Sequence, residues 1–468
     1  MDAGDPMSKD YAKYSFWLEH SGDDLTPRPP LDGSTEVDIA IMGAGFTGLW
    51  TAYHLLRRDP SLNVLVVEKE IAGFGASGRN GGWCFSGFPV LPRELIDRHG
   101  REMARQVSLA MADSVDNVGA VCAEEGIDAH YAHGGELEVA RAAYDLPKLQ
   151  GMYDEYAAIG LEDRVQLLDA AQTADRLRIA GAVGAFWNKD GAAVQPARLV
   201  RGLARAVERR GGRIVEQTAV TDYSGGQPPV LHTARGDVRA RRAIVLAGEA
   251  YLSQLRKLRR HVIPMTSHMV VTEPLSPELW ERIGWDRREV LGGFGTTGGY
   301  IQHTADGRIA FGAYRARYPY NSVISDDLDR QEDIFEHARI AARTWFPDLR
   351  ETAFTHSWGG VFGTPRDGMP TMGFNPRTGV ALAYGYTGEG VATSNLSGRV
   401  LTDLITETDS ALTRLPMASH NPAVWEPEPL RTLGVNLVRQ ARYFENEEVE
   451  RTGEYPEWPK LVHRLIGR

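Results

Sequence analysis

Hydrophobic residues change their spacing twice between residues 38 and 68. A short run over 38–42, apolar after Asp38, predicts a buried strand, and a second apolar run that ends just before Glu68 predicts another. Between them the apolar residues recur at helical spacing until Asp59-Pro60 ends the pattern. The apolar positions of this predicted helix are Leu49, Ala52, Leu55 and Leu56. The segment therefore has the order strand, helix, strand.

The same order returns later in the chain. Residues 196–210 predict an amphipathic helix with Pro196 in its first turn, and 213–216 and 243–247 predict strands. The intervening residues 91–187 are mostly helical in pattern and do not continue the first unit. We therefore expect the first sheet to resume after an inserted second domain.

Short β-strands separated by Gly and Asp-Gly turns are predicted from 264 to 357. These strands are 268–272, 290–293, 300–303 and 308–312. Residues 380–405 then predict a strand, a glycine-rich turn and a helix.

The two ends of the chain have less regular patterns. Residues 1–33 predict an extended arm because of their prolines, with Trp17 and Leu18 holding it to the surface. Residues 413–468 predict a polar tail with one or two helices.

Three glycines, Gly43, Gly45 and Gly48, lie between the first strand and its helix. Glycine at these positions permits a tight turn, a close approach of backbone to a pyrophosphate, and close packing of helix on strand. Glu68 at the end of the next strand suits the hydroxyls of an adenosine ribose. The complete unit predicts an adenine dinucleotide site, and an ordinary glycine turn in an α/β sheet is the alternative.

Two further glycine-rich turns extend this prediction. Residues 73–84 read GFGASGRNGGWC, in which Ser77 and Arg79 suit phosphate and the glycines let backbone N–H groups approach a flavin ring. At 388–390 a Gly-Glu-Gly turn opens a helix whose N-terminus would stabilise a reduced, anionic flavin. A surface loop and a plain helix cap are the respective alternatives.

Composition narrows the class of protein. The 468 residues are 42% hydrophobic and 24% charged, with a net charge of −10, which argues against nucleic acid and anionic membranes as partners. Two cysteines, Cys84 and Cys122, form no disulfide framework, so we expect a cytoplasmic protein. We find no secretory signal and no apolar run long enough to span a membrane.

Several motifs resemble those of the FAD-dependent D-amino-acid-oxidase-like superfamily, and within it the γ-glutamylputrescine oxidase-like amine oxidases. The matching segments follow one another in the same order over nearly the whole chain. They are the βαβ unit, GASGRNGGW at 75–83, DGAAVQPARLVRGLA at 190–204, PMTSHMVVTEPL at 264–275, ADGRIAFG at 305–312, SWGGVFGTPRDGMPTMG at 357–373 and YGYTGEGVA at 384–392.

The resemblance implies an α/β fold (α+β overall), in which a Rossmann-type FAD-binding domain is interleaved with a β-sheet-based substrate domain. The expected pieces are an N-terminal arm at 1–33, the FAD-binding domain at 34–90, 188–263 and 356–412, the substrate domain at 91–187 and 264–355, and a C-terminal helical tail at 413–468.

The same resemblance implies an FAD-dependent oxidoreductase acting on CH–NH or CH–NH2 donors. Hydride would pass from the carbon next to an amine nitrogen to flavin N5, the imine would hydrolyse, and dioxygen would reoxidise the flavin to give hydrogen peroxide. A flavin dehydrogenase of an amine or amino acid with another electron acceptor, and a non-catalytic FAD-binding protein, are the alternatives. The oligomeric state is left open.

The resemblance and the glycine turns together give a set of expected site residues. For the substrate side they are His268, Tyr300, Trp358 and Glu389, with no metal ligand. For non-covalently bound FAD they are Gly43, Gly45, Phe46, Thr47, Gly48, Glu68, Lys69, Gly75, Ala76, Ser77, Arg79, Asn80, Gly81, Gly82, Trp83, Val220, Ala247, Gly248, Gly363, Thr387, Gly388, Gly390, Val391 and Ala392.

Three positions depart from the family pattern. Glu389 stands where relatives often have histidine, and Gln302 and His303 stand where they tend to have basic residues. Arg315 is a candidate for binding a substrate carboxylate. The exact amine or amino acid is therefore left open.

Overall fold

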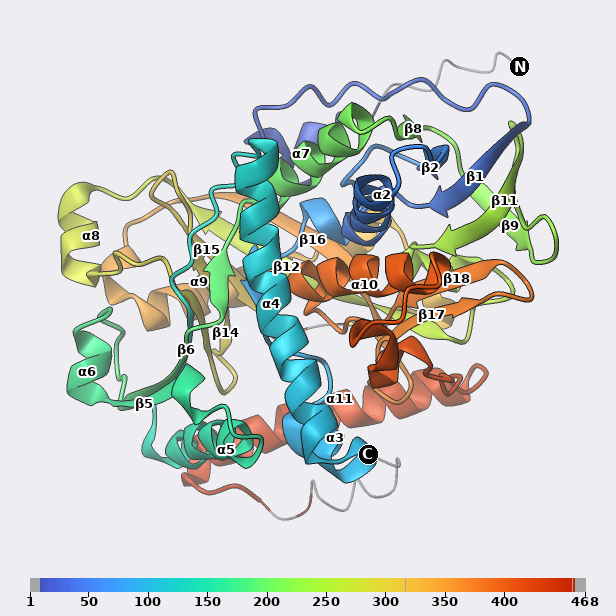
Figure 1. The fold of residues 1–468 in the computed structure, drawn as a ribbon. Coiled ribbons are helices and arrows are strands. Elements are labelled where there is room, and N and C mark those ends of the chain that lie inside the picture. The colour runs from blue at the N-terminus through green and yellow to red at the C-terminus, as the bar shows by residue number, and fades with distance from the viewer. Residues whose placement is uncertain (1–8, 316, 457, 459–468) are drawn as a thin grey trace.

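Two eight-stranded sheets organise the chain, which a computed structural model describes for residues 9–315, 317–456 and 458 (Figure 1). The strands of the first sheet are β1 (Thr35–Met42), β2 (Val64–Val67), β8 (Arg213–Val215), β9 (Val220–Ser224), β10 (Val230–Thr233), β11 (Gly236–Leu246), β17 (Thr371–Asn375) and β18 (Val380–Tyr384). Their order is β17-β18-β11-β1-β2-β8, and β10 and β9 continue from β11. Strands β18, β11, β1, β2 and β8 run parallel, so their carboxyl ends meet at one edge.

The second sheet is built from two separate stretches of chain. Its strands are β4 (Glu136–Ala140), β5 (Val165–Asp169), β6 (Gly184–Asn188), β12 (Val262–Thr272), β13 (Val290–Gly293), β14 (Gly299–His303), β15 (Ile309–Ala313) and β16 (Phe354–Pro365). Their order is β16-β12-β15-β14-β13-β4-β6-β5. A small ribbon of β3 (Trp83–Phe85) and β7 (Gly191–Ala193) completes the strands.

The helices cover both sheets. They are α1 (Phe16–Glu19), α2 (Phe46–Arg58), α3 (Pro92–His99), α4 (Arg101–Glu125), α5 (Leu146–Ala158), α6 (Ala170–Ala174), α7 (Pro196–Arg209), α8 (Pro277–Ile283), α9 (Glu332–Trp345), α10 (Gly390–Ile405) and α11 (Leu430–Thr452). Apolar side chains of α2, α4, α7 and α10 form one core with Ile39, Ile41 and Val66 of the first sheet. Helix α9 packs its own apolar face against the second sheet.

This architecture confirms the predicted α/β fold with an interleaved β-sheet layer. The helix expected at 196–210 is α7, and the four strands expected between 268 and 312 occur as β12 to β15. The segment 91–187 was predicted to be mostly helical, and this was wrong for β4, β5 and β6. Those strands are five residues each and lie between longer helices, so helical periodicity dominates their surroundings.

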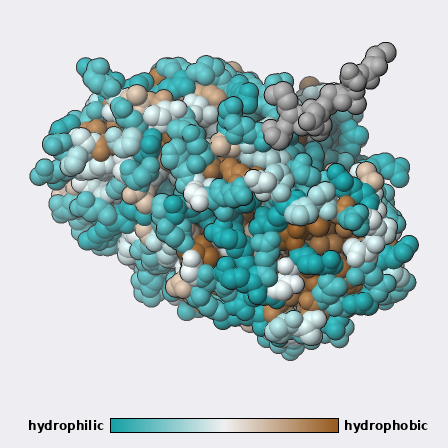
Figure 2. All heavy atoms as spheres, turned by 90° about the horizontal axis from the view of Figure 1, so that it is seen from above, coloured by the Kyte–Doolittle hydropathy of each residue, from teal (hydrophilic) through white to brown (hydrophobic). Residues whose placement is uncertain are grey.

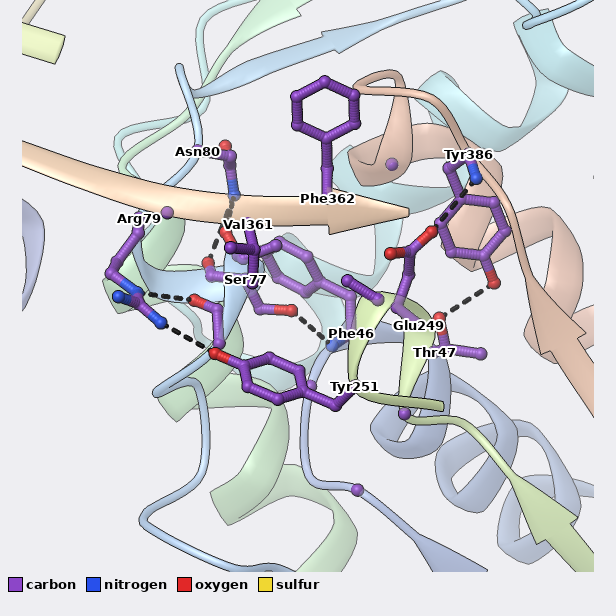
Figure 3. Close-up of a pocket in the computed structure, with 18 of the residues that line it drawn as sticks. Phe46, Thr47, Ser77, Arg79, Asn80, Glu249, Tyr251, Val361, Phe362 and Tyr386 are labelled. Atoms are coloured by element: carbon purple, nitrogen blue, oxygen red, sulfur yellow. Dashed lines mark hydrogen bonds between the residues drawn. The ribbon is translucent and has the colours of Figure 1, made fainter. Parts of the chain in front are cut away.

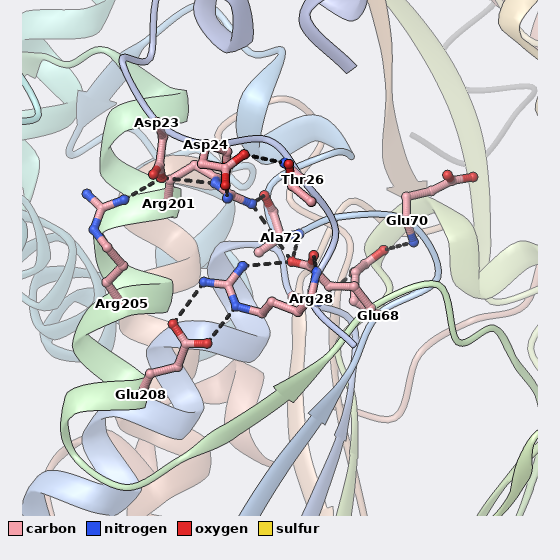
Figure 4. A network of polar contacts seen from close by, with 12 residues as sticks. Asp23, Asp24, Thr26, Arg28, Glu68, Glu70, Ala72, Arg201, Arg205 and Glu208 are labelled. Carbon is pink, nitrogen blue, oxygen red and sulfur yellow. Dashed lines mark hydrogen bonds and ion pairs between the residues drawn. The ribbon is translucent and has the colours of Figure 1, made fainter. Parts of the chain in front are cut away.

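The N-terminal arm is more structured than expected. It contains a 3-10 turn (Tyr11–Tyr14) and α1, which Ser15 caps by accepting a hydrogen bond from the Leu18 backbone N–H. Trp17 and Leu18 are each 1% exposed, so they belong to the core. Further on, Arg28 binds Glu208 of α7 and Glu216 through its guanidinium, which fixes the arm across α7 (Figure 4).

The C-terminal segment contributes α11, which lies beside both layers in Figure 1. Its predicted remainder at 457 and 459–468 lies outside the described residues. Hydrophilic residues cover most of the face seen in Figure 2, with hydrophobic residues visible in a few patches between them. No helix among the described residues is both long and apolar enough to cross a membrane.

We predict that the arm is an integral part of the fold. Trp17→Ala should lower the free energy of unfolding by about 3–5 kcal/mol, because it empties a fully packed aromatic site. Trp17→Phe should cost only about 1 kcal/mol, mainly for the lost hydrogen bond from Trp17 Nε1 to the Asn80 carbonyl. Urea unfolding curves measure both variants, and equal stability of all three proteins would contradict this role.

Candidate functional site

A cavity of about 680 Å³ lies where the carboxyl edge of the first sheet faces the second sheet (Figure 3). Its lining comes from the turns after β1, β2 and β11, from the loop at 73–84, from β14 to β16, and from the turn before α10. Segments far apart in the sequence therefore close one chamber.

The turn between β1 and α2 leaves no room for side chains. Gly43 has a φ of +99°, and a Cβ there would lie 2.9 Å from the Ala247 carbonyl oxygen. A Cβ on Gly48 would lie 2.0 Å from the Gly43 carbonyl oxygen, so α2 packs directly on the turn. Gly45 precedes the first residue of α2 and lines the cavity. The free N–H groups of a helix N-terminus therefore face the cavity, as an anion site requires.

Glu68 lines the same end of the cavity. Its carboxylate accepts hydrogen bonds from the backbone N–H groups of Ala44, at 2.8 Å, and Glu70, at 2.9 Å. Burial raises the pKa of Glu68 to about 7. The carboxylate is thus held rigidly at the end of β2, where it can accept hydrogen bonds from hydroxyl groups of a ligand.

The loop at 73–84 is anchored from outside the cavity. The buried guanidinium of Arg79 forms an ion pair with Asp329, at 2.6 Å, and donates to the Tyr251 hydroxyl, at 2.9 Å (Figure 3). The indole N–H groups of Trp17 and Trp358 donate to the carbonyls of Asn80 and Arg79. Arg79 therefore fixes the loop, and its guanidinium is engaged by protein groups rather than free for a phosphate.

The turn before α10 is held by a buried acid. Glu249 accepts hydrogen bonds from the backbone N–H groups of Gly385, at 3.0 Å, and Tyr386, at 3.1 Å. The Tyr386 hydroxyl lies 2.9 Å from Thr47 Oγ1 on α2 (Figure 3). Gly388, with a φ of +102°, then turns the chain into α10. The two helix N-termini are therefore tied to each other across the cavity.

One row of residues crosses the second sheet on the face toward the glycine loops. Strand register aligns Glu138, Gly292, Tyr300, Gly312 and Met269 on neighbouring strands. A Cβ at Gly312 would lie 1.9 Å from the Tyr300 ring, and a Cβ at Gly81 would lie 2.7 Å from it. The Tyr300 ring is therefore held flat between the sheet and the loop. Burial raises the pKa of Tyr300 to about 12, so its hydroxyl keeps its proton.

Three carboxylates gather at this side of the cavity. Burial, with a contribution from Glu136, raises the pKa of Glu389 to about 8 and holds the pKa of Glu138 well above its ordinary value. Burial raises the pKa of Glu136 to about 7. None of the three forms an ion pair with a basic residue in the described part of the chain. This side of the site is therefore acidic and lacks a compensating cation.

Most of the expected site residues line this cavity. They are Gly43, Gly45, Phe46, Thr47, Glu68, Lys69, Gly75, Ala76, Ser77, Arg79, Asn80, Gly81, Trp83, Val220, Ala247, Gly248, Tyr300, Thr387, Gly388, Glu389, Gly390 and Val391. Gly48, Gly82, Gly363 and Ala392 lie just behind the lining, in or against the same turns.

Two expected substrate-side residues lie elsewhere. His268 is fully buried, bonds through Nε2 to the Leu328 carbonyl, and packs on Phe335 of α9, on the opposite face of the sheet. Burial lowers its pKa, so it is neutral. Trp358 lies behind the loop that it binds, as a positioning residue rather than as part of the lining.

The structure also shows where Gln302, His303 and Arg315 lie. Gln302 is buried and donates to the Val194 carbonyl, at 2.8 Å. His303 stacks on Trp280 with ring centroids 3.7 Å apart, away from the cavity. The Arg315 guanidinium lies 5.6 Å from the Tyr443 ring centroid and does not line the cavity. In the described lining the basic side chains are Lys69, beside Glu68, and Arg79, already paired.

Several lining and near-lining residues were missed from the sequence. They are Glu136, Glu138, Glu249, Tyr251, Ser267 and Tyr314. Two acids alternating with apolar residues at 136–139 were the available signal, because this pattern is typical of a strand with one polar face. Tyr251 and Glu249 follow the end of β11, an edge where ligand contacts gather in parallel sheets, so strand assignment alone could have indicated them.

Thiols and imidazoles are absent from the described lining of the cavity. Cys84 and Cys122 are both buried and unpaired, and burial raises the pKa of each thiol. Glu19, His20 and His356 form a group that could hold a metal ion, but it lies outside the cavity.

The first sheet carries glycine turns and an acid suited to a ribose at the carboxyl edge of its parallel strands, and a second, mainly antiparallel sheet faces that edge. This combination defines a dinucleotide-binding flavoprotein. The profile of the DAO family, described as FAD dependent oxidoreductase, matches residues 38–404. The chain therefore belongs to the DAO family of FAD-dependent oxidoreductases, which confirms the resemblance seen in its motifs.

Individual relatives agree with this assignment. Gamma-glutamylputrescine oxidoreductase of Escherichia coli is 29% identical over 396 residues, which cover 84% of this chain and 88% of the relative. Glycine oxidase of Geobacillus kaustophilus is 25% identical over 395 residues, or 81% and 96% of the two chains. The crystal structure of that glycine oxidase shares the fold with a TM-score of 0.69 at 23% identity, over 82% of this chain and 99% of the other.

The cavity fits FAD. A Cβ at Gly43 or Gly48 would take up the space in the turn between β1 and α2. Glu68 lines the cavity where the ribose of an adenosine would lie. The buried hydroxyl of Thr387 also lines the cavity, without a hydrogen-bond partner among the described residues. Gly43, Gly45, Glu68, Ser77 and the turn at 387–391 would hold the cofactor, which supplies the hydride acceptor.

We predict that Gly48→Ala weakens FAD binding at least about tenfold, because the new methyl group would overlap the Gly43 carbonyl and push α2 off the turn. The FAD-to-protein absorbance ratio after dialysis measures the effect. Gly151→Ala on α5 is the matched control, since a Cβ there meets nothing within 4 Å. Unchanged FAD content in Gly48→Ala would contradict the proposed cradle.

We also predict a pH effect at Glu389. Its folded pKa of about 8 exceeds the ordinary value of 4.5, so the folded chain keeps a proton that the unfolded chain releases. Its contribution to stability is complete below the ordinary value and is lost as the pH rises through about 8. Glu389→Gln should flatten the decline in melting temperature over this range and melt higher than the wild type above it. Parallel melting-temperature profiles of the two proteins would exclude this.

Proposed function

We propose that the chain is an FAD-dependent amine oxidase. The observation that carries the proposal is an acidic wall: Glu389 belongs to the cavity lining, Glu136 and Glu138 on β4 lie outside the lining beside it, and the one guanidinium of the described lining is already paired. Such a wall suits an amine and disfavours a substrate whose reacting carbon bears a carboxylate. The names of two relatives, a gamma-glutamylputrescine oxidoreductase and a glycine oxidase, support oxidation next to nitrogen.

The proposed reaction removes two electrons from the substrate. The carbon next to nitrogen loses hydride, the nitrogen lone pair forms the C=N bond, and water then converts the imine to a carbonyl compound and an amine. Bound FAD would supply the hydride acceptor, and dioxygen would take up the two electrons with two protons and leave as hydrogen peroxide.

Residues of the chain orient the amine and shield it from water. Tyr300, fixed between Gly81 and Gly312, and Trp83, whose indole N–H donates to the Ile301 carbonyl, form an aromatic wall. Aromatic faces attract cationic amines. Glu389 faces the same chamber from the turn before α10.

The proposal includes non-covalent FAD and a cytoplasmic location. The described lining of the cavity contains no cysteine or histidine to which FAD could be covalently attached. Two unpaired buried cysteines suit a reducing compartment.

Anaerobic mixing of the FAD-bound protein with a panel of amines and amino acids tests the proposal. We expect an amine to bleach the flavin absorbance, and air to restore it with one hydrogen peroxide per flavin. Reduction without peroxide formation would indicate a dehydrogenase with another acceptor. Full FAD occupancy without reduction by any compound would indicate a non-catalytic flavoprotein. An α-amino acid as the best reductant would contradict the amine preference.

A further inference from the structure

In the row of residues that crosses the second sheet, an acid lies two strands away from Tyr300, just outside the cavity lining. Glu138 on β4 lies opposite Gly292 on β13, which in turn lies opposite Tyr300 on β14. A Cβ at Gly292 would lie 2.0 Å from Glu138 Oε1, so the carboxylate rests on the bare backbone of Gly292 and leans toward Tyr300. The Tyr300 ring leans the other way, over Gly312. The two side chains therefore leave the strip of sheet between them uncovered.

A second acid reaches this region from the opposite side. Glu389, on the turn before α10, lines the cavity, and its Oε2 atom is fully buried without a hydrogen-bond partner among the described residues. A buried carboxylate oxygen without a partner costs free energy that a bound donor would recover. Glu389 is thus suited to a ligand group that donates hydrogen bonds and carries positive charge.

Tyr314 lies between these acids. It lines the cavity with 57% of its surface exposed, and its ring centroid is 5.8 Å from that of Tyr300. The exposed surface of Tyr314 belongs to the cavity lining, inside which desolvation first and then the nearby acids Glu138, Glu136 and Glu389 raise the pKa of its hydroxyl. The ring is therefore an open aromatic face beside acids that burial keeps largely protonated, and an ammonium group bound there would favour their ionised form and contact the aromatic face.

We propose that Glu138, Glu389 and Tyr314 form a subsite for a second cationic group of the substrate, so that the preferred substrates are diamines or polyamines. This rests on the proposed amine oxidation in the same cavity. The nitrogen next to the oxidised carbon must be neutral to lose hydride. The far nitrogen stays protonated, and its positive charge lowers the pKa values of Glu138 and Glu389, so that both acids bind it as carboxylates. Charge-assisted hydrogen bonds to both acids then hold the substrate in one direction.

The test compares 1,4-diaminobutane with butylamine on the FAD-bound protein. Flavin reduction gives kcat and KM, and calorimetry gives the affinity. For the wild type we expect the diamine to have a KM at least about tenfold lower than the monoamine, the effect of one charge-assisted hydrogen bond. Glu138→Gln and Glu389→Gln should each remove most of this difference in KM, and Glu138→Gln, at a position outside the cavity lining, should leave kcat for butylamine within about twofold.

Glu155→Gln on α5 is the matched control. Burial also raises the pKa of that carboxyl to about 7, but Glu155 lies outside the cavity lining, so its variant should keep the wild-type preference. FAD content reports whether each variant is folded. Glu138 and Glu389 lie on different elements and are replaced in separate variants. If one variant fails to fold, the other still tests the subsite.

The outcomes separate the subsite from the proposed function. Equal KM values for the two amines, or an unchanged preference in both glutamine variants, would overturn the subsite while amine oxidation stands. Diamine binding that requires Glu138 and Glu389 but never reduces the flavin would support the subsite and overturn the oxidase proposal.

Discussion

The buried ion pair between Arg79 and Asp329 is the contact on which the cavity depends. It joins the glycine-rich loop that follows β2 to the far side of the second sheet, and Tyr251 adds a third partner after β11. Removing one partner from such a pair leaves an uncompensated buried charge, which is costly. The loop is therefore fixed from behind, and its glycines are free to face the ligand.

The two sheets contribute different chemistry to one chamber. The parallel sheet supplies backbone: the carboxyl ends of its strands, the N-termini of α2 and α10, and turns in which Gly43 and Gly48 leave no space for side chains. The second sheet supplies side chains, because Gly292 and Gly312 allow Glu138 and Tyr300 to lie flat across it. In the proposed arrangement the first layer holds the cofactor, and the substrate contacts Tyr300 of the second sheet and Glu389 of the turn before α10.

The cofactor half of this arrangement could be predicted from sequence, whereas most of the substrate half could not. Gly43, Gly45, Gly48 and Glu68 lie within one local unit whose spacing has a direct physical meaning. The proposed roles of Glu138 and Tyr314 depend on strand register and on a turn that is close in space but remote in sequence, so the sequence alone does not indicate them. His268 illustrates the same limit, because alternation on β12 alone does not tell which face meets α9.

A crystal structure of the FAD-bound protein would show directly whether one chamber between the two sheets holds the cofactor. We expect density for the adenosine ribose at Glu68, for the pyrophosphate at the N-terminus of α2, and for the flavin ring between the turn at Gly388 and the Tyr300 wall. A flavin ring outside this chamber, or one that turns its reactive face away from Tyr300, would contradict this expectation.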